Sequence, residues 1–170
     1  MIRYFCDRYI SLTARVSVLG AWVSGLLLVY SVGHILLDIV LRVGFGTSTH
    51  TMDELVGYAI GATIFWSLAY AQTRDGLIRV TLIPALLKSE NSKKWLDAVG
   101  LVLALLTAIF LAYFMTRIAH TNFLNGRRSI GMAQVLIWMP QTFMLLGLYA
   151  FILQTFASIL ALFITPSQAR

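Results

Sequence analysis

Long apolar stretches alternate with short polar segments along this chain. A helix needs roughly 20 apolar residues to cross a hydrocarbon core about 30 Å thick. Three stretches reach this length, and the second reaches it once the small and polar residues at its edges are included. The pattern predicts four transmembrane helices, near residues 16–41, 53–73, 95–116 and 141–164. The connections are too short for a soluble module, so we expect one all-α integral membrane domain over residues 1–170.

Two shorter segments have an amphipathic pattern. Over residues 1–15, apolar side chains from Ile2 to Leu12 recur at spacings of three and four, which favours a short helix on the membrane surface. Residues 77–88 are largely apolar, but they are too short to span and contain a proline. We expect an interfacial segment there.

Composition supports a membrane protein. Hydrophobic residues make up 59% of the 170 residues and charged residues 12%, and the mean hydropathy is +0.81. Soluble domains carry about 25% charged residues. The net charge of +6 comes from residues that flank the apolar stretches, which favours anionic lipid headgroups as partners rather than nucleic acid.

Lysine and arginine are distributed unevenly around the predicted helices. Nine lie in the N-terminal segment, the connection between the second and third helices and the C-terminal tail, and four lie in the other two connections. Because cytoplasmic loops carry the excess of these residues, both termini are predicted to be cytoplasmic. On the outer side, Asn125-Gly126 is typical of a turn, and Pro140 suits the first turn of the last helix.

Small residues recur at spacing four within the predicted helices. Gly57 and Gly61 open the second helix, and Gly100, Ala104 and Ala108 continue to Ala112 on the third. Such rows allow close van der Waals approach of helices in lipid. They could pack the four helices together or form a docking face for a second membrane protein.

A polar face lies at the outer end of the first predicted helix. Tyr30, His34, Asp38 and Arg42 recur at spacing four, and Glu54 begins the next helix on the same side. We expect His34, Asp38, Arg42 and Glu54 to form a charged outer cluster with a structural or interface role, because a proton relay would need further groups at mid-depth. Removing Arg42 is expected to be more harmful than replacing Asp38 with asparagine, because it strands two carboxylates.

Two other functions remain open from the residues alone. His34 and His120 both lie toward the outer side, so a haem-bearing membrane anchor of a redox enzyme is an alternative. A pore or small exporter formed by several copies would need a polar face through the membrane. The sequence contains no metal-ligand cluster, phosphate loop or activated nucleophile, so we expect neither an enzyme nor a cofactor.

Several motifs occur in a characteristic order. The first part of the chain contains Arg42-Val43-x-Phe45, Asp53-Glu54-Leu55-x-x-Tyr58, then Phe65, Ala69 and Tyr70, and Arg74-Asp75-Gly76-Leu77-Ile78-Arg79-Val80. The later part contains Ser129-Ile130, Trp138-Met139-Pro140-Gln141 and Gly147. Together they resemble the DctQ-like small membrane subunit of tripartite ATP-independent periplasmic (TRAP) transporters. Gly57, Leu77 and Thr81 depart from the family's usual Arg, His and Asp.

This resemblance implies a bacterial inner-membrane protein that works with a large multi-span transport subunit and a periplasmic substrate-binding protein. It implies that the small subunit braces the large one and helps to dock the binding protein, while uptake of an organic acid anion is driven by an ion gradient. The small subunit itself is expected to contain no substrate site. The candidate subunit-interface residues are Arg42, Glu54, Gly57, Tyr58, Gly61, Arg79, Gly100, Ala104, Ala108, Pro140 and Gln141.

Overall fold

The computed structural model describes residues 2–74 and 90–164. These residues form four long helices: α1 (Ile2–Phe45), α2 (Met52–Thr73), α4 (Glu90–Leu124) and α5 (Trp138–Ile164). The all-helical architecture predicted from the sequence is therefore confirmed for the described part of the chain. Pro140 lies in the first turn of α5, as its missing N–H predicts.

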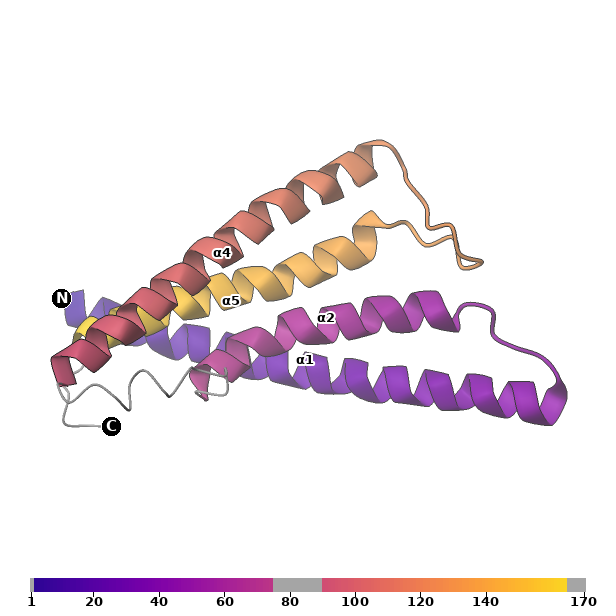
Figure 1. The fold of residues 1–170 in the computed structure, drawn as a ribbon, viewed down its shortest axis with the longest axis horizontal. Coiled ribbons are helices and arrows are strands. Elements are labelled where there is room, and N and C mark those ends of the chain that lie inside the picture. Colours follow the sequence, from indigo (N-terminus) through magenta and orange to yellow (C-terminus); the bar gives the residue numbers. More distant parts are fainter. Residues whose placement is uncertain (1, 75–89, 165–170) are drawn as a thin grey trace.

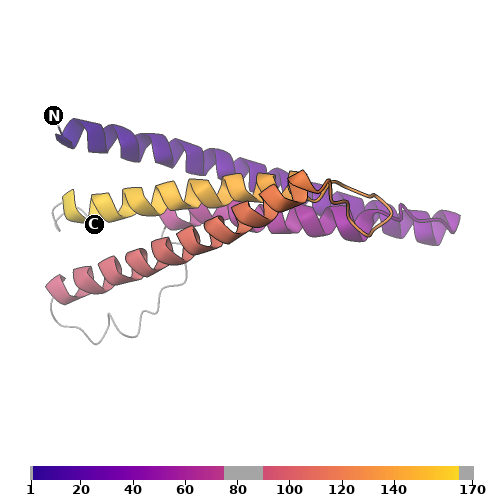
Figure 2. The same ribbon diagram turned by 90° about the horizontal axis from the view of Figure 1, so that it is seen from above.

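The helices run up and down in sequence order (Figure 1). The α1–α2 and α4–α5 connections lie at one end of the bundle, which we call the loop end. The starts of α1 and α4 and the end of α5 lie at the opposite end, which we call the terminal end. There, α5 lies between α1 and α4 (Figure 2). Both ends of the described chain thus lie on the same side of the bundle.

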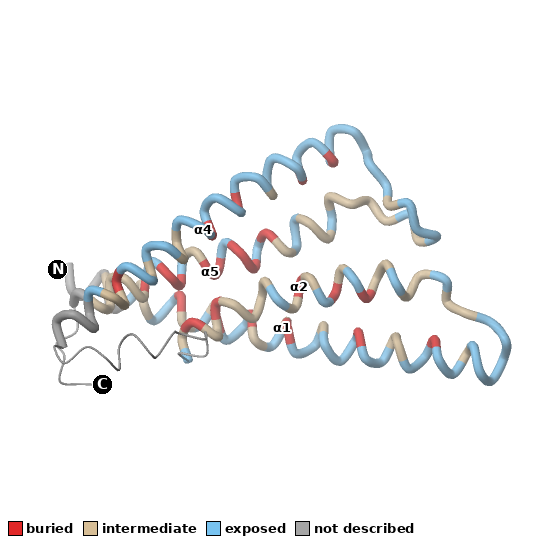
Figure 3. Tube along the Cα trace, in the orientation of Figure 1, coloured by how far each residue is buried: buried red, intermediate tan, exposed pale blue. Residues whose placement is uncertain are grey.

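The core is built from small residues. α5 packs against each of the other three helices, and α1 also packs on α2. The buried cluster consists of Ala69, Ala108, Ala112, Leu148, Ala150 and Phe151. Small side chains let the helix backbones approach closely, which is a main source of helix association in lipid. The outward sides of α1 and α4 remain exposed along most of their length (Figure 3).

Three of the described helices are long and apolar enough to cross a membrane: Arg8–Phe45, Trp95–Leu124 and Trp138–Leu162. α2 is not among them, because its first turn is acidic and polar residues recur along its length. Its 22 residues nevertheless give a length of about 33 Å at 1.5 Å per residue. Four spans with cytoplasmic termini therefore stay a prediction.

The N-terminal segment differs from the sequence-based expectation. Residues 2–15 are not a separate surface helix but the first part of α1, which is continuous to Phe45. Neither proline nor glycine occurs before Gly20, so nothing interrupts the helical backbone there. The Tyr9 hydroxyl also donates a hydrogen bond to the backbone carbonyl of Leu153 on α5, at 3.1 Å. The predicted interfacial segment 77–88 and Arg79 lie outside the described residues.

Candidate functional site

Asp38 is the centre of a group of polar contacts at the loop end. It contacts Arg42, Ser48 and Thr49, and we call this group the Asp38 knot. Its carboxylate is 1% exposed although it lies on α1 among apolar residues. One oxygen, Oδ2, forms an ion pair with the Arg42 guanidinium at 2.7 Å. The other, Oδ1, accepts hydrogen bonds from the Ser48 hydroxyl and from both the backbone N–H and the hydroxyl of Thr49, at 2.8–2.9 Å. A buried carboxylate is tolerated here because both of its oxygens have donors.

The knot holds the connection between α1 and α2. α1 ends at Phe45, and Gly46 follows with a positive φ of 64°, which lets the chain turn back. The Thr47 N–H donates to the Leu41 carbonyl, and Ser48 and Thr49 then bind α1 through the Asp38 carboxylate. Arg42 pairs with Asp38 from the surface of the protein, where its side chain is 58% exposed. Its guanidinium therefore presents positive charge at the molecular surface.

The other two members of the predicted charged cluster lie in different surroundings. The Tyr30 hydroxyl is 3.1 Å from Nδ1 of His34, and their rings meet edge to face at 5.6 Å. Glu54 accepts no hydrogen bond from any described residue, and both of its carboxylate oxygens are buried. The structure thus brings Asp38 and Arg42 together but joins neither His34 nor Glu54 to them. Glu54 forms no hydrogen bond or ion pair with the described residues around Asp38, so the structure does not support the expectation that loss of Arg42 strands two neighbouring carboxylates.

Glu54 lies beneath the connection between α4 and α5. Its carboxylate contacts Gly131, and a Cβ on that glycine would collide with it. This connection bends toward the start of α2 (Figure 1). No sequence pattern predicts this contact, because the two residues are far apart in the chain and Gly131 lies outside the helices.

The α4–α5 connection is itself ordered by a short ladder of backbone hydrogen bonds. Ser129 N–H donates to the carbonyl of Val135, and Ile137 N–H donates to that of Arg127. Gly126 has a positive φ of 56°, so the predicted Asn125-Gly126 turn is confirmed. At its base, the buried Asn122 amide donates to the side-chain carbonyl of Gln141 at 2.9 Å, which links α4 to α5.

The small-residue candidates and the other interface candidates lie in different surroundings. Ala108 is 3% exposed and belongs to the core, and a Cβ on Gly61 would come within 2.7 Å of the Met144 side chain on α5. These two positions serve packing within the chain. Gly57 and Gly100 are exposed, and a Cβ at either would meet no atom within 4 Å. Tyr58, Ala104 and Pro140 are half-buried.

The closest helix approaches occur at two other glycines. A Cβ on Gly147 of α5 would lie 2.8 Å from the backbone of Phe65 and Trp66, and one on Gly20 of α1 would lie 2.7 Å from the Trp66 carbonyl oxygen. The Trp66 indole N–H also donates to the Phe143 carbonyl at 3.0 Å. The three helices α1, α2 and α5 thus meet at one tryptophan.

A comparison with protein families identifies the chain. The model of the family described as "Tripartite ATP-independent periplasmic transporters, DctQ component" matches residues 31–165. The chain belongs to the DctQ family. No curated protein and no solved structure was found to match it.

The DctQ match includes the loop end, from His34 on α1 through the α4–α5 connection. It establishes this chain as the small membrane component of a tripartite periplasmic transporter. The haem alternative gains no support from the geometry, because His34 lies on α1 and His120 on α4, two helices that do not pack extensively on each other. Within residues 2–74 and 90–164, no group of metal-ligating side chains was found.

Proposed function

We propose that this DctQ chain is a structural subunit that braces the large transport subunit in the bacterial inner membrane. The observation that carries the proposal is the family match over residues 31–165. In this proposal the chain has four spans with both termini in the cytoplasm. It acts without a cofactor or a substrate site of its own, and the large subunit and the binding protein provide sodium-coupled uptake of an organic acid anion.

The uncovered helix faces support the bracing role. α1 and α4 expose large apolar side chains along the bundle, including Trp22, Leu26, Phe110 and Tyr113. Gly57 and Gly100 add positions where another helix could approach the backbone directly. We place the contact with the large subunit on faces that include these two glycines.

The loop end supports a role in docking the periplasmic binding protein. Under the proposed topology this end faces the periplasm. Arg42, Arg127 and Arg128 are exposed there, and the hydrogen-bonded α4–α5 connection holds two of them in a fixed loop. A positively charged rim favours encounter with an acidic surface, and it acts mainly on the association rate.

Co-purification and uptake test the proposal. Deleting the chain should abolish uptake that depends on the binding protein, and restoring it should recover uptake. Gly57→Leu and Gly100→Leu should weaken co-purification with the tagged large subunit without changing the stability of this chain. Full uptake by cells that lack this chain would contradict the proposal.

A further inference from the structure

α1 turns small and polar side chains toward the bundle. Among its described residues, the buried ones are Thr13, Ser17, Gly20, Ser24, Ser31 and Asp38. Four of them, from Ser17 to Asp38, recur at intervals of seven residues. Helices in lipid approach one another closely over small residues. Since this inward row packs on the side of α2 and α5, most of the large apolar side chains of α1 lie elsewhere on the helix.

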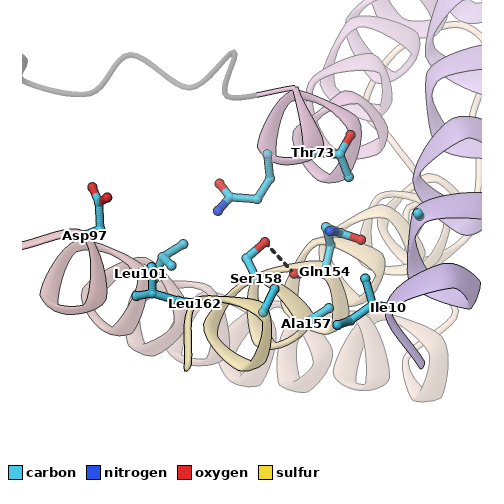
Figure 4. Close-up of a pocket in the computed structure, with 11 residues that line it drawn as sticks. Ile10, Thr73, Asp97, Leu101, Gln154, Ala157, Ser158 and Leu162 are labelled. Atoms are coloured by element: carbon cyan, nitrogen blue, oxygen red, sulfur yellow. Dashed lines mark hydrogen bonds between the residues drawn. The ribbon is translucent and has the colours of Figure 1, made fainter. Parts of the chain in front are cut away.

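Contacts near the two ends of the inward row fix the rotation of α1 in the bundle. The Ser17 hydroxyl donates a hydrogen bond to the side-chain carbonyl of Gln154 on α5, at 3.1 Å. Ile10, seven residues earlier, lines a cavity of about 380 Å³ together with Thr73 of α2 and Gln154 (Figure 4). At the loop end, Asp38 accepts hydrogen bonds from the connection to α2. The side of α1 opposite the inward row is therefore held away from the other helices.

Two rows of exposed residues run along that opposite side. Residues two positions apart lie about 200° apart around a helix, so the row two positions before the inward row faces outward. It consists of Trp22, Val29, Leu36 and Val43, which are 57–85% exposed. A second exposed row beside it consists of Leu26, Gly33 and Val40. Together the seven positions alternate at spacings of four and three, which is the pattern with which one helix packs along another. We call these seven residues the α1 outer seam.

Under the proposed topology, the α1 outer seam extends beyond the hydrocarbon core of the membrane. Arg15 is exposed and precedes the seam on α1. Counted from Arg15, roughly 20 residues cover a core about 30 Å thick, so the residues from about 36 onward lie beyond it. The end of α1 also extends past the α4–α5 connection (Figure 1 and Figure 2). The ion pair between Asp38 and Arg42 lies in this part of α1, where water lowers the cost of charge.

Lipid tails do not cover the part of the seam that lies beyond the core. Leu36, Val40 and Val43 expose apolar side chains there. Leaving apolar surface in water is unfavourable, and exposed apolar patches mark interaction sites. A soluble partner reaches only this end, because Trp22 and Val29 lie within the core. A single occupant of the whole seam is therefore an integral membrane protein with a helix that continues beyond the core.

We propose that the α1 outer seam packs along one long helix of the large transport subunit, from within the membrane to beyond its periplasmic surface. This inference rests on the proposed bracing function and adds α1 to the faces at Gly57 and Gly100. Gly33 has no atom within 4 Å of its Cβ position, so the partner helix approaches the α1 backbone closely there. Asp38 holds the α1–α2 connection on the other side of α1, which leaves the outer end of the seam open to this helix.

Photo-crosslinking in the assembled transporter tests this proposal. A benzophenone-bearing amino acid is placed at Val29, within the core, or at Val43, beyond it. Both positions should crosslink to the large subunit, and the two crosslinked sites should lie about 14 residues apart on one helix, because packed helices have the same rise per residue. Leu28 is the matched control position. It is also exposed, but it lies about 100° from Val29 around α1, so it should crosslink to the large subunit much more weakly.

Paired polar substitutions beyond the core measure the strength of the contact. Val40→Gln combined with Val43→Gln should reduce co-purification with the tagged large subunit about tenfold or more, because two valines lose an apolar partner surface. Leu37→Gln combined with Ile39→Gln is the matched control, because both residues are exposed in the same part of α1 but lie outside the seam. Neither pair alters a buried residue, so thermal unfolding of the isolated chain should be unchanged in both.

The outcomes separate this inference from the proposed function. If cells without this chain retain full uptake, the proposed function fails whatever the crosslinks show. If uptake depends on the chain, the seam inference is overturned by crosslinks to a second copy of this chain, by a crosslink from Val43 to the binding protein alone, or by the absence of any crosslink. Equal co-purification of the two glutamine pairs would also overturn it.

Discussion

Gly147 of α5 lies in direct backbone contact with Phe65 of α2. A Cβ on Gly147 would stand 2.8 Å from the Phe65 carbonyl carbon and 3.0 Å from its oxygen. Backbone atoms cannot rotate away as the end of a side chain can, so even a methyl group requires the helices to separate. This crossing fixes the distance between the two central helices of the bundle.

We therefore predict that Gly147→Ala destabilises the bundle by about 1–3 kcal/mol, the usual cost of overpacking. Thermal unfolding of the purified chain in detergent measures the effect. Gly100→Ala is the control, because Gly100 has open space around it and alanine favours a helix by about 1 kcal/mol over glycine. Equal stability of the two variants would show that α2 and α5 are not held at this distance.

The Asp38 knot leads to a second prediction, which reverses the order expected from the sequence. Asp38→Leu leaves the half-buried Thr49 N–H and two hydroxyls without their acceptor, at about 1 kcal/mol or more for each lost bond. Arg42→Ala leaves those three bonds intact and removes an ion pair whose arginine is 58% exposed, which is worth about 1 kcal/mol. Asp38→Leu should therefore be the more damaging change.

Chemical denaturation of the two purified variants distinguishes these effects. Asp38→Asn is an informative intermediate, because its remaining side-chain oxygen can still accept from Ser48 and Thr49 but no longer pairs with Arg42. It should lie between the other two in stability. If Arg42→Ala were the least stable of the three, the ion pair rather than the loop contact would hold this end.

The sequence predicted the helices well because lipid-exposed segments must be both apolar and continuous. It located α2 within a residue of its observed bounds and identified the turn at Gly126. It did not predict that residues 2–15 continue α1, because amphipathic spacing describes a face of a helix and not where the helix begins.

Most details of the candidate site could not be predicted from the sequence, because they depend on tertiary contacts. The pairing of Asp38 with Arg42 follows from their spacing on one helix. The bonds from Ser48 and Thr49 and the contact of Glu54 with Gly131 depend on how two connections fold back. No pattern along the chain encodes these contacts. Similarly, Gly57 and Gly61 belong to the same row of small residues, and the sequence does not distinguish them. In the structure, Gly61 packs against Met144, whereas Gly57 has no atom within 4 Å of its Cβ position.

Topology gives a third prediction. In a Cys6→Ser background, Asn125→Cys at the loop end should react with a membrane-impermeant thiol reagent in intact cells. Asn91→Cys in the first turn of α4 should react only after permeabilisation. The expectation rests on the nine-to-four distribution of lysine and arginine. The opposite labelling pattern would place the terminal end in the periplasm.

The contact between Glu54 and Gly131 gives the last prediction. Gly131→Ala should displace the α4–α5 connection from the start of α2, because the new methyl group would collide with the Glu54 carboxylate. Glu54→Ala removes the obstacle, and it also removes two buried oxygens that have no hydrogen-bond partner among the described residues. The double variant should therefore be more stable than Gly131→Ala alone. A double-mutant cycle on thermal stability should give a coupling energy of about 0.5–3 kcal/mol, as for residues in contact.

Met132→Ala, a neighbouring change at an exposed residue, should show no coupling to Glu54→Ala. Additive effects of Gly131→Ala and Glu54→Ala would mean that the connection does not rest on Glu54.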